Sequence, residues 1–144
     1  MRVSIPGVLI GGVVDVTSSF VAGLPFALYS VFKLNPSQRV GGQGSGAVPA
    51  AIHANLPLYA AELVVGLLCS ALGGYVAAAI AKRYERLNGL LSSYLCVGLS
   101  VALMLLGWDK DPRWLQALLL VASPALAFAG GDLRLRQRRA RSTI

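Results

Sequence analysis

Four long apolar runs divide the chain, and shorter polar segments separate them. The runs cover about residues 4–32, 58–81, 87–107 and 114–131. Each run approaches or exceeds the roughly 20 residues that a helix needs to cross the hydrocarbon core of a bilayer. No alternation of apolar and polar residues typical of a membrane barrel is present, and lipid does not tolerate open sheet edges. The pattern therefore predicts an all-α integral membrane protein, with residues 1–144 forming one four-transmembrane-helix bundle.

The first run is longer than a bilayer core requires, and it carries an acidic residue, Asp15. A cleaved signal peptide has an apolar region of only ~7–15 residues, which is about half the length of this run. We therefore expect the run to stay in the protein as a helix that tilts, kinks near Pro25 or projects from the membrane. Before the fourth run, Asp111 and Pro112 have the residue types of a helix start.

The composition favours lipid as the solvent. Hydrophobic residues make up 56% of the chain and charged residues only 13%, whereas a soluble domain carries about a quarter charged residues. So few charges cannot solvate a globule of 144 residues. Asn35 is followed by Pro36, which leaves no usable glycosylation sequon at this position and fits a bacterial inner membrane.

The basic residues predict the orientation, because Lys and Arg favour the cytoplasmic side of a membrane. With four spans, both chain ends and the loop between the second and third runs share one side. We place this side, and therefore both termini, in the cytoplasm. The cytoplasmic side collects Arg2, Lys82, Arg83, Arg86, Arg134, Arg136, Arg138, Arg139 and Arg141. The outer side collects Lys33, Arg39, Lys110 and Arg113.

Two polar segments lie outside the predicted spans. The basic tail, residues 132–144, is typical of a contact with anionic lipid headgroups or of an anchor that sets the topology. Its cations are not spread over a folded face, as they are in a nucleic-acid-binding module. The outer loop, residues 33–57, has a Gly-rich stretch at 41–46 that is either functional or simply disordered. The arginines proposed for lipid contact are Arg134, Arg136, Arg138, Arg139 and Arg141.

The loop between the second and third runs is too short to form a domain of its own. It covers residues 82–86 and makes the two helices an antiparallel hairpin. Within it, Glu85 has Lys82 and Arg86 as local candidates for an ion pair.

Small residues recur four positions apart in three of the runs. Such stripes let helix backbones approach closely, which is the main source of helix association in lipid. We expect them to pack helices within one bundle or between copies in an oligomer. The alternative is that two of the stripes also line a polar path. The predicted packing residues are Gly11, Ser19, Gly23, Gly66, Ser70, Gly74, Ala78, Ser92, Cys96 and Ser100.

Two acids, Asp15 and Glu62, lie well inside the apolar runs, and each falls on a small-residue stripe. A charge at the bilayer centre costs on the order of 3 kcal/mol on insertion scales. Each acid should therefore be protonated, paired, hydrated or turned toward the bundle interior. Their predicted depths differ by roughly 10–15 Å at 1.5 Å per residue, so they fit successive stations on a path better than one shared ion site. Glu62 is alternatively stabilised by the dipole at its helix start or by Lys33.

The chain offers few groups for catalysis. It has one histidine, His53, in the outer loop, and two cysteines, Cys69 and Cys96, inside apolar runs. These residues have no CxxC or metal-site spacing, and the sequence contains neither a paired nucleophile and base nor a Walker loop. We therefore predict no enzymatic activity, no metal and no cofactor.

These observations favour a small, non-enzymatic inner-membrane protein that acts as an oligomer or as a subunit of a larger membrane complex. The chain is too small to bury three small-residue faces by itself. The expected partners are the lipid bilayer, including anionic lipids, and further copies of the chain or another membrane protein, but not nucleic acid. The alternative is a pore or a proton- or ion-coupled small transporter that uses Asp15 and Glu62. A lipid-handling role would depend on the basic tail.

Overall fold

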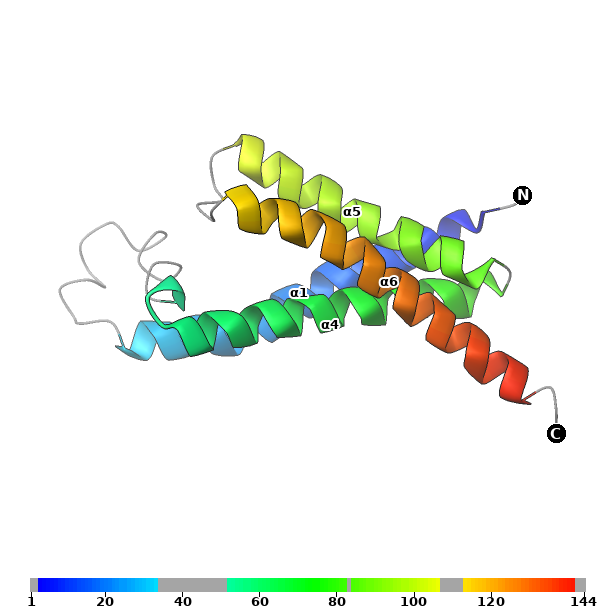
Figure 1. Cartoon of the computed structure of the whole chain (residues 1–144), viewed down its shortest axis with the longest axis horizontal. Helices are drawn as coiled ribbons and strands as arrows, with labels where there is room; N and C mark the ends of the chain where they lie inside the picture. Colours follow the sequence, from blue (N-terminus) through cyan, green and yellow to red (C-terminus); the bar gives the residue numbers. More distant parts are fainter. Residues whose placement is uncertain (1–2, 34–51, 83, 107–112, 142–144) are drawn as a thin grey trace. The chain divides into compact units, whose positions relative to one another are not determined.

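The chain is all-helical in the computed structural model, which describes residues 3–33, 52–82, 84–106 and 113–141, without the side chains of 103–104 and 113–116. Four long helices follow one another in the described residues (Figure 1): α1 (Ile5–Lys33), α4 (Leu56–Ala81), α5 (Glu85–Leu105) and α6 (Arg113–Arg141). Three of them are long and apolar enough to cross a membrane, namely α1, α4 and the Ala117–Arg141 part of α6.

The four helices coincide with the four apolar runs, and the prediction of an all-helical fold is confirmed. The main difference lies at the C-terminus, where α6 continues through much of the predicted tail to Arg141. Leu, Arg, Gln and Ala are good helix formers, and the i,i+4 ion pair between Asp132 and Arg136 supports the extension. The predicted helix start at 111–112 and the Gly-rich stretch at 41–46 lie outside the described residues.

Contacts within the chain group it into two compact units, which are described separately. Unit 1 consists of Met1–Ser18 and Leu67–Ile144, and unit 2 consists of Ser19–Gly66. Helices α1 and α4 each contribute residues to both units. The expectation of a single membrane domain stays a prediction.

Unit 1 combines the first part of α1 and the second part of α4 with the α5–α6 pair. Helices α5 and α6 run antiparallel and lie side by side (Figure 1). The backbone N–H of Ser4, before α1, donates to Asn88 Oδ1 in the first turn of α5 over 2.9 Å. Arg138, near the end of α6, donates to the carbonyl oxygen of Lys82 between α4 and α5. The start of α1, the α4–α5 turn and the end of α6 therefore meet at one end of unit 1.

The interior of unit 1 holds small and polar side chains, while large apolar side chains point outward. Val121 and Leu105 in unit 1 are 73% and 81% exposed, and Phe20 and Phe32 in unit 2 are 72% and 76% exposed. A water-soluble protein has the reverse distribution. The fully buried side chains of unit 1 include Asp15, Ala77, Asn88, Ser92, Ser93 and Ala127.

Glycines allow the helices of unit 1 to approach at backbone distance. A Cβ on Gly11 of α1 would lie 2.5 Å from the Cβ of Ala77 in α4. A Cβ on Gly74 of α4 would lie 2.6 Å from the Cα of Ala127 in α6. Real Cβ atoms essentially never come within 3.0 Å of such atoms. Unit 1 is therefore held together by close backbone contact rather than by large interdigitating side chains.

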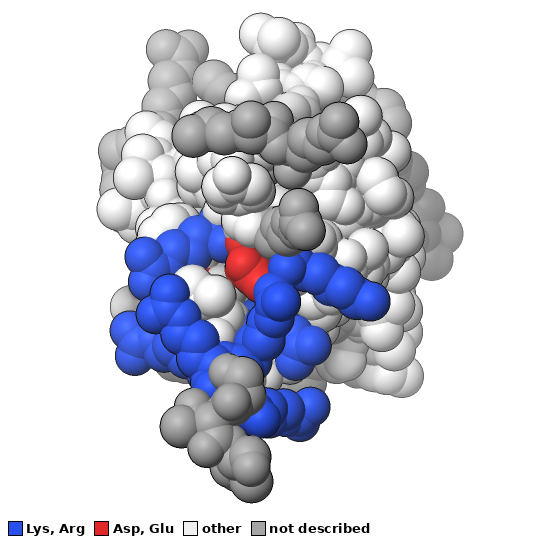
Figure 2. All heavy atoms as spheres, turned by 90° about the vertical axis from the view of Figure 1, so that its right-hand side faces the viewer, with Lys and Arg blue, Asp and Glu red and all other residues white. Residues whose placement is uncertain are grey.

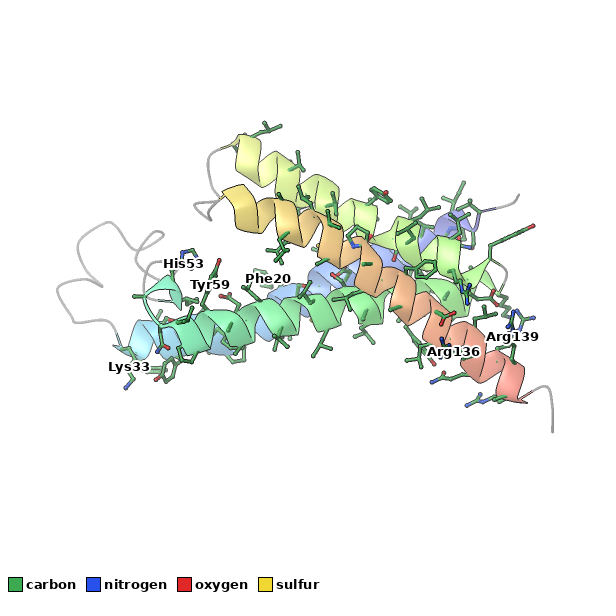
Figure 3. The ribbon with its side chains drawn as sticks, viewed as in Figure 1. Phe20, Lys33, His53, Tyr59, Arg136 and Arg139 are labelled. Atoms are coloured by element: carbon green, nitrogen blue, oxygen red, sulfur yellow. The ribbon has the colours of Figure 1, made fainter. Side chains whose placement is uncertain are left out.

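Unit 2 contains the second part of α1 and the first part of α4. The ammonium group of Lys33 lies 5.6 Å from the centre of the Tyr29 ring. His53, which precedes α4, packs against Tyr59 with the two rings tilted by 60° and their centroids 4.6 Å apart (Figure 3). The lone histidine thus takes part in an aromatic contact.

Candidate functional site

A buried polar cluster joins three helices of unit 1. Asp15 of α1 is fully buried, and its Oδ1 accepts a hydrogen bond of 3.1 Å from Ser70 Oγ of α4. Ser70 Oγ lies 2.9 Å from Ser123 Oγ of α6. Because a hydroxyl has one proton to donate, donation by Ser70 to Asp15 makes Ser123 the donor to Ser70. We call Asp15, Ser70 and Ser123 the Asp15 cluster.

The backbone around the Asp15 cluster explains how a carboxyl group reaches this position. A Cβ on Gly73 would lie 2.6 Å from the Cβ of Asp15, so only glycine lets α1 approach α4 at this level. Ser18 Oγ donates to the carbonyl oxygen of Asp15 over 3.1 Å within α1. A carboxyl group beside two hydroxyl groups offers oxygen atoms that can hold a proton or a small hard cation.

Glu62, the second predicted acid, does not belong to this cluster. It lies in unit 2, about two helical turns before Ser70 in α4, and is half-buried. Its predicted role as a second station on a polar path, and its pairing with Lys33, stay predictions. Within the described ranges, no group of three or more His, Cys, Asp or Glu side chains could hold a metal ion. Cys69 is buried and Cys96 half-buried, and both are free thiols.

The predicted packing residues differ in burial. Two of them, Gly23 and Gly66, have no described atom within 4 Å of the position of a Cβ. The same holds for Gly98 of α5, which is not among the predicted packing residues. The half-buried members are Ser19, Gly23, Gly66 and Cys96, and Ser100 is exposed. The buried members are Gly11, Ser70, Gly74, Ala78 and Ser92.

Sequence reasoning missed the contribution of α6 to the interior of unit 1. Ser123, Ala127 and Gly131 recur at four-residue spacing and form a fourth small-residue stripe, the signal that would have revealed it. Ala127 is fully buried, and a Cβ on Gly131 would lie 2.8 Å from the carbonyl oxygen of Glu85 in α5. This stripe places Ser123 opposite α4.

Asn88 was also missed, although an Asn in an apolar run is itself a signal of a buried hydrogen bond. Its side chain is fully buried. Its Oδ1 accepts from the Ser4 backbone N–H, and its Nδ2 donates to the carbonyl oxygen of Tyr84 over 3.0 Å. Asn88 therefore connects the start of α1 with the start of α5.

A strongly basic surface covers the end of unit 1 where α1 starts and α6 ends. Figure 2 shows Lys and Arg side chains gathered there around acidic side chains. In Figure 3, Arg136 and Arg139 lie on the last turns of α6. We call this surface the basic end, and define it by Lys82, Glu85, Arg86, Asp132, Arg134, Arg136, Arg138, Arg139 and Arg141.

Ion pairs between helices organise the basic end. Glu85 Oε1 lies 2.7 Å from Arg138 Nη1 of α6, so its partner is not one of the local candidates but a residue of another helix. Arg86 instead pairs with Asp132 of α6, with Nη2 and Oδ1 2.6 Å apart. The other carboxylate oxygen of Asp132 accepts from Arg136 Nε over 2.7 Å. The antiparallel packing of α5 and α6 brings these residues together.

The two carboxyl groups of the basic end are held in their ionised form. Burial by itself would raise the pKa of Glu85, but hydrogen bonds from its own backbone N–H and from Arg138 outweigh burial, and the pKa is lowered. The guanidinium groups of Arg86 and Arg136 hold the pKa of Asp132 below its ordinary value. Hydrogen bonds and nearby cations favour the charged form of a carboxyl group.

The helical tail also packs against α4. Tyr75 Oη donates to Gln137 Oε1 over 2.8 Å, and the Arg134 guanidinium lies 5.8 Å from the centre of the Tyr75 ring. On the neighbouring helix, the Arg86 guanidinium lies 5.7 Å from the Phe128 ring. Contacts of this kind between a cation and an aromatic ring contribute about 0.5–1 kcal/mol at exposed sites.

No protein family, curated protein or solved structure matches this chain. Its function is therefore inferred from its own residues, from the Asp15 cluster, the small-residue contacts and the basic end.

Proposed function

We propose that the chain is a small four-span membrane protein with both termini in the cytoplasm, and that it acts without catalysis as an oligomer or as a subunit of a larger membrane complex. The observation that carries the membrane assignment is the inverted distribution of side chains, with polar groups inside and large apolar groups outside. Water-soluble monomers rarely expose apolar patches of this extent, whereas lipid favours such a surface and requires polar groups to find partners inside.

In this proposal α5 is the fourth span. Its 21 residues rise about 31 Å along the helix axis, close to the roughly 30 Å thickness of the hydrocarbon core. Its polar residues Asn88, Ser92 and Ser93 are fully buried and would not face lipid. Four alternating spans would bring the basic end to one side of the membrane, and the positive-inside rule favours the cytoplasm.

Assembly with another chain is supported by glycines that have open space around them. Gly98, Gly23 and Gly66 have no described atom within 4 Å of the position of a Cβ. Glycine costs about 1 kcal/mol relative to alanine in a helix, and in a membrane it is useful where a second helix approaches closely. We infer that a helix from another copy or from another membrane protein packs against these positions.

The test of assembly measures the mass of the full-length protein in a mild detergent, for the wild type and for Gly66→Leu and Gly98→Leu. We expect an assembly that either leucine weakens while unfolding of the single chain is unchanged. Val121→Leu, at an exposed apolar position without glycine, is the matched control and should leave the assembly intact. A wild-type monomer that copurifies with no other protein would overturn the proposal.

A pore or a proton- or ion-coupled small transporter is the second candidate, and the Asp15 cluster favours it. Asp15 lies ten residues after Ile5, or about 15 Å along α1, near the middle of a hydrocarbon core of roughly 30 Å. A buried acid at that depth with hydroxyl donors on two other helices fits a proton or cation relay. Asp15→Asn keeps the acceptor oxygen for Ser70 and removes the titratable group. Proton-dependent flux into proteoliposomes that is the same for wild type and variant would exclude this role for Asp15.

A further inference from the structure

We propose that the basic end binds the phosphate headgroups of anionic phospholipids, and that Arg134 is the main phosphate ligand. The inference depends on the proposed membrane insertion, because only an inserted chain brings this surface to the height of the headgroups. The experiment below separates a failure of the lipid site from a failure of the membrane assignment.

The basic end has an excess of positive charge whatever the arrangement of its ion pairs. It carries seven Lys and Arg residues and two carboxylates, Glu85 and Asp132, which leaves five net positive charges. Both carboxylates are already engaged, with N···O distances of 2.6–2.7 Å to arginines. Because α6 is helical as far as Arg141, the charges are held close together on a rigid element. Bound anions relieve the repulsion among them.

Arg134 is the cation best prepared to hold a phosphate group. Its guanidinium lies over the ring of Tyr75, and Tyr75 is itself held by the hydrogen bond to Gln137. Arg134 is also half-buried, unlike the last five basic and polar positions of α6, which are exposed. A guanidinium group that is already positioned loses less conformational freedom on binding, and its planar array of N–H donors can contact two phosphate oxygens at once.

The surroundings of Arg134 fit an amphiphilic ligand. Leu72 and Leu68 are exposed on the same face of α4 as Tyr75, three and seven residues before it. A phosphate at Arg134 would therefore sit next to an apolar helix surface on which acyl chains can lie. From Arg134 to Arg141 the helix rises about 10 Å, comparable with a headgroup layer of roughly 5–8 Å. A nucleic acid has no acyl chains to place against this surface.

The test uses full-length protein in a mild detergent with equal amounts of phosphatidylglycerol and phosphatidylcholine, and measures retained lipid by native mass spectrometry. We expect the wild type to retain phosphatidylglycerol in preference. Arg134→Gln should weaken this binding about fivefold, the size expected for one basic residue near an anionic surface. Tyr75→Leu should weaken it less, because the charge remains. Lys33→Gln is the matched control, since Lys33 also lies over a tyrosine ring and its loss changes the charge equally.

Equal losses for Arg134→Gln and Lys33→Gln, or no preference of the wild type for phosphatidylglycerol, would overturn the lipid site. Single-stranded RNA that binds more tightly than phosphatidylglycerol and displaces it would assign the surface to nucleic acid and overturn it too. Arg141→Gln, at the exposed last position of α6, is a second variant with little effect on packing, and we expect it to weaken lipid binding in the same direction. Wild-type protein that stays in buffer without detergent would instead overturn the membrane assignment.

Discussion

Gly74 offers a direct test of the backbone contact between α4 and α6. In Gly74→Ala the new Cβ would lie 2.6 Å from the Cα of Ala127, below the 3.0 Å limit for real Cβ contacts, and backbone atoms cannot swing away as a side chain can. The two helices must therefore separate by several tenths of an ångström. Ser70 and Ser123 lie one turn before Gly74 and Ala127, so the separation should also lengthen their hydrogen bond of 2.9 Å.

The expected loss of stability in Gly74→Ala has two parts, the overpacking between α4 and α6 and the lengthened hydrogen bond between Ser70 and Ser123. Overpacking a well-packed interior costs about 1–3 kcal/mol, and loss of one buried hydrogen bond adds about 1 kcal/mol. Gly98→Ala is the matched control when both variants are measured on the dissociated single chain, because it makes the same substitution in a helix of unit 1 where no described atom lies within 4 Å of the new Cβ. Dissociation removes the contact with another chain that is proposed at Gly98. The gain in helix propensity is common to both variants. We therefore expect Gly74→Ala to be less stable than Gly98→Ala by about 2–4 kcal/mol.

The assay is reversible unfolding in a non-ionic detergent with increasing dodecyl sulfate, followed by circular dichroism. A difference between the two alanine variants of less than about 0.5 kcal/mol, which is within the range of ordinary surface substitutions, would refute the reasoning. A second readout uses Ser123→Ala, which should lower the free energy of unfolding less in the Gly74→Ala background than in the wild type. Equal costs in both backgrounds would show that the hydroxyl contact does not depend on the approach of the helices.

Three further outcomes are expected. Asn88→Ala should lower the free energy of unfolding by about 1–3 kcal/mol, because it leaves buried polar groups without their partner; unchanged unfolding in the same titration would contradict this. Below the ordinary range of carboxyl pKa values, the stabilisation from Asp132 and Glu85 should be lost, because a lowered pKa in the folded state contributes stability only while the group is ionised. Protection of the amides in the last turns of α6, corrected for the intrinsic exchange rate at each pH, should fall between pH 7 and pH 2, and protection that is unchanged would count against the ion pairs. Ser70→Ala should destabilise unit 1 more than Ser123→Ala, because Ser70 bonds to both neighbours, and the reverse order would contradict the central position of Ser70 in the Asp15 cluster.

The helices themselves were predictable because their cause is local. A helix forms its backbone hydrogen bonds within one segment, so a run of about 20 apolar residues predicts a helix without reference to the rest of the chain. The continuation of α6 to Arg141 differs from the prediction of a basic tail after residue 131, although the residues of this segment favour a helix. The Asp132–Arg136 pair within α6 is the local signal that indicated otherwise.

The partners of the functional residues were decided by the tertiary structure. The sequence placed Asp15 on a small-residue stripe and identified Ser70 as a packing residue, but it did not identify Ser123 or connect the three. For Glu85 it offered two neighbours, whereas the folded chain pairs it with Arg138, which lies 53 positions away. Many helix rotations and neighbours satisfy the same apolar pattern, and the contacts between the helices, among them those of the glycines, select one.

Sequence alone determined where the helices lie, how few charges they carry and at which positions small residues recur, because these properties depend on composition and on spacing along one segment. Only the packed structure decided which helices meet, which hydroxyl groups reach Asp15 and which arginines the two carboxylates hold. The physical reason is the range of the forces involved. Hydrogen bonds form at about 3 Å, and the ion pairs of the basic end have N···O distances of 2.6–2.7 Å, so their partners are defined only after the backbones have come together.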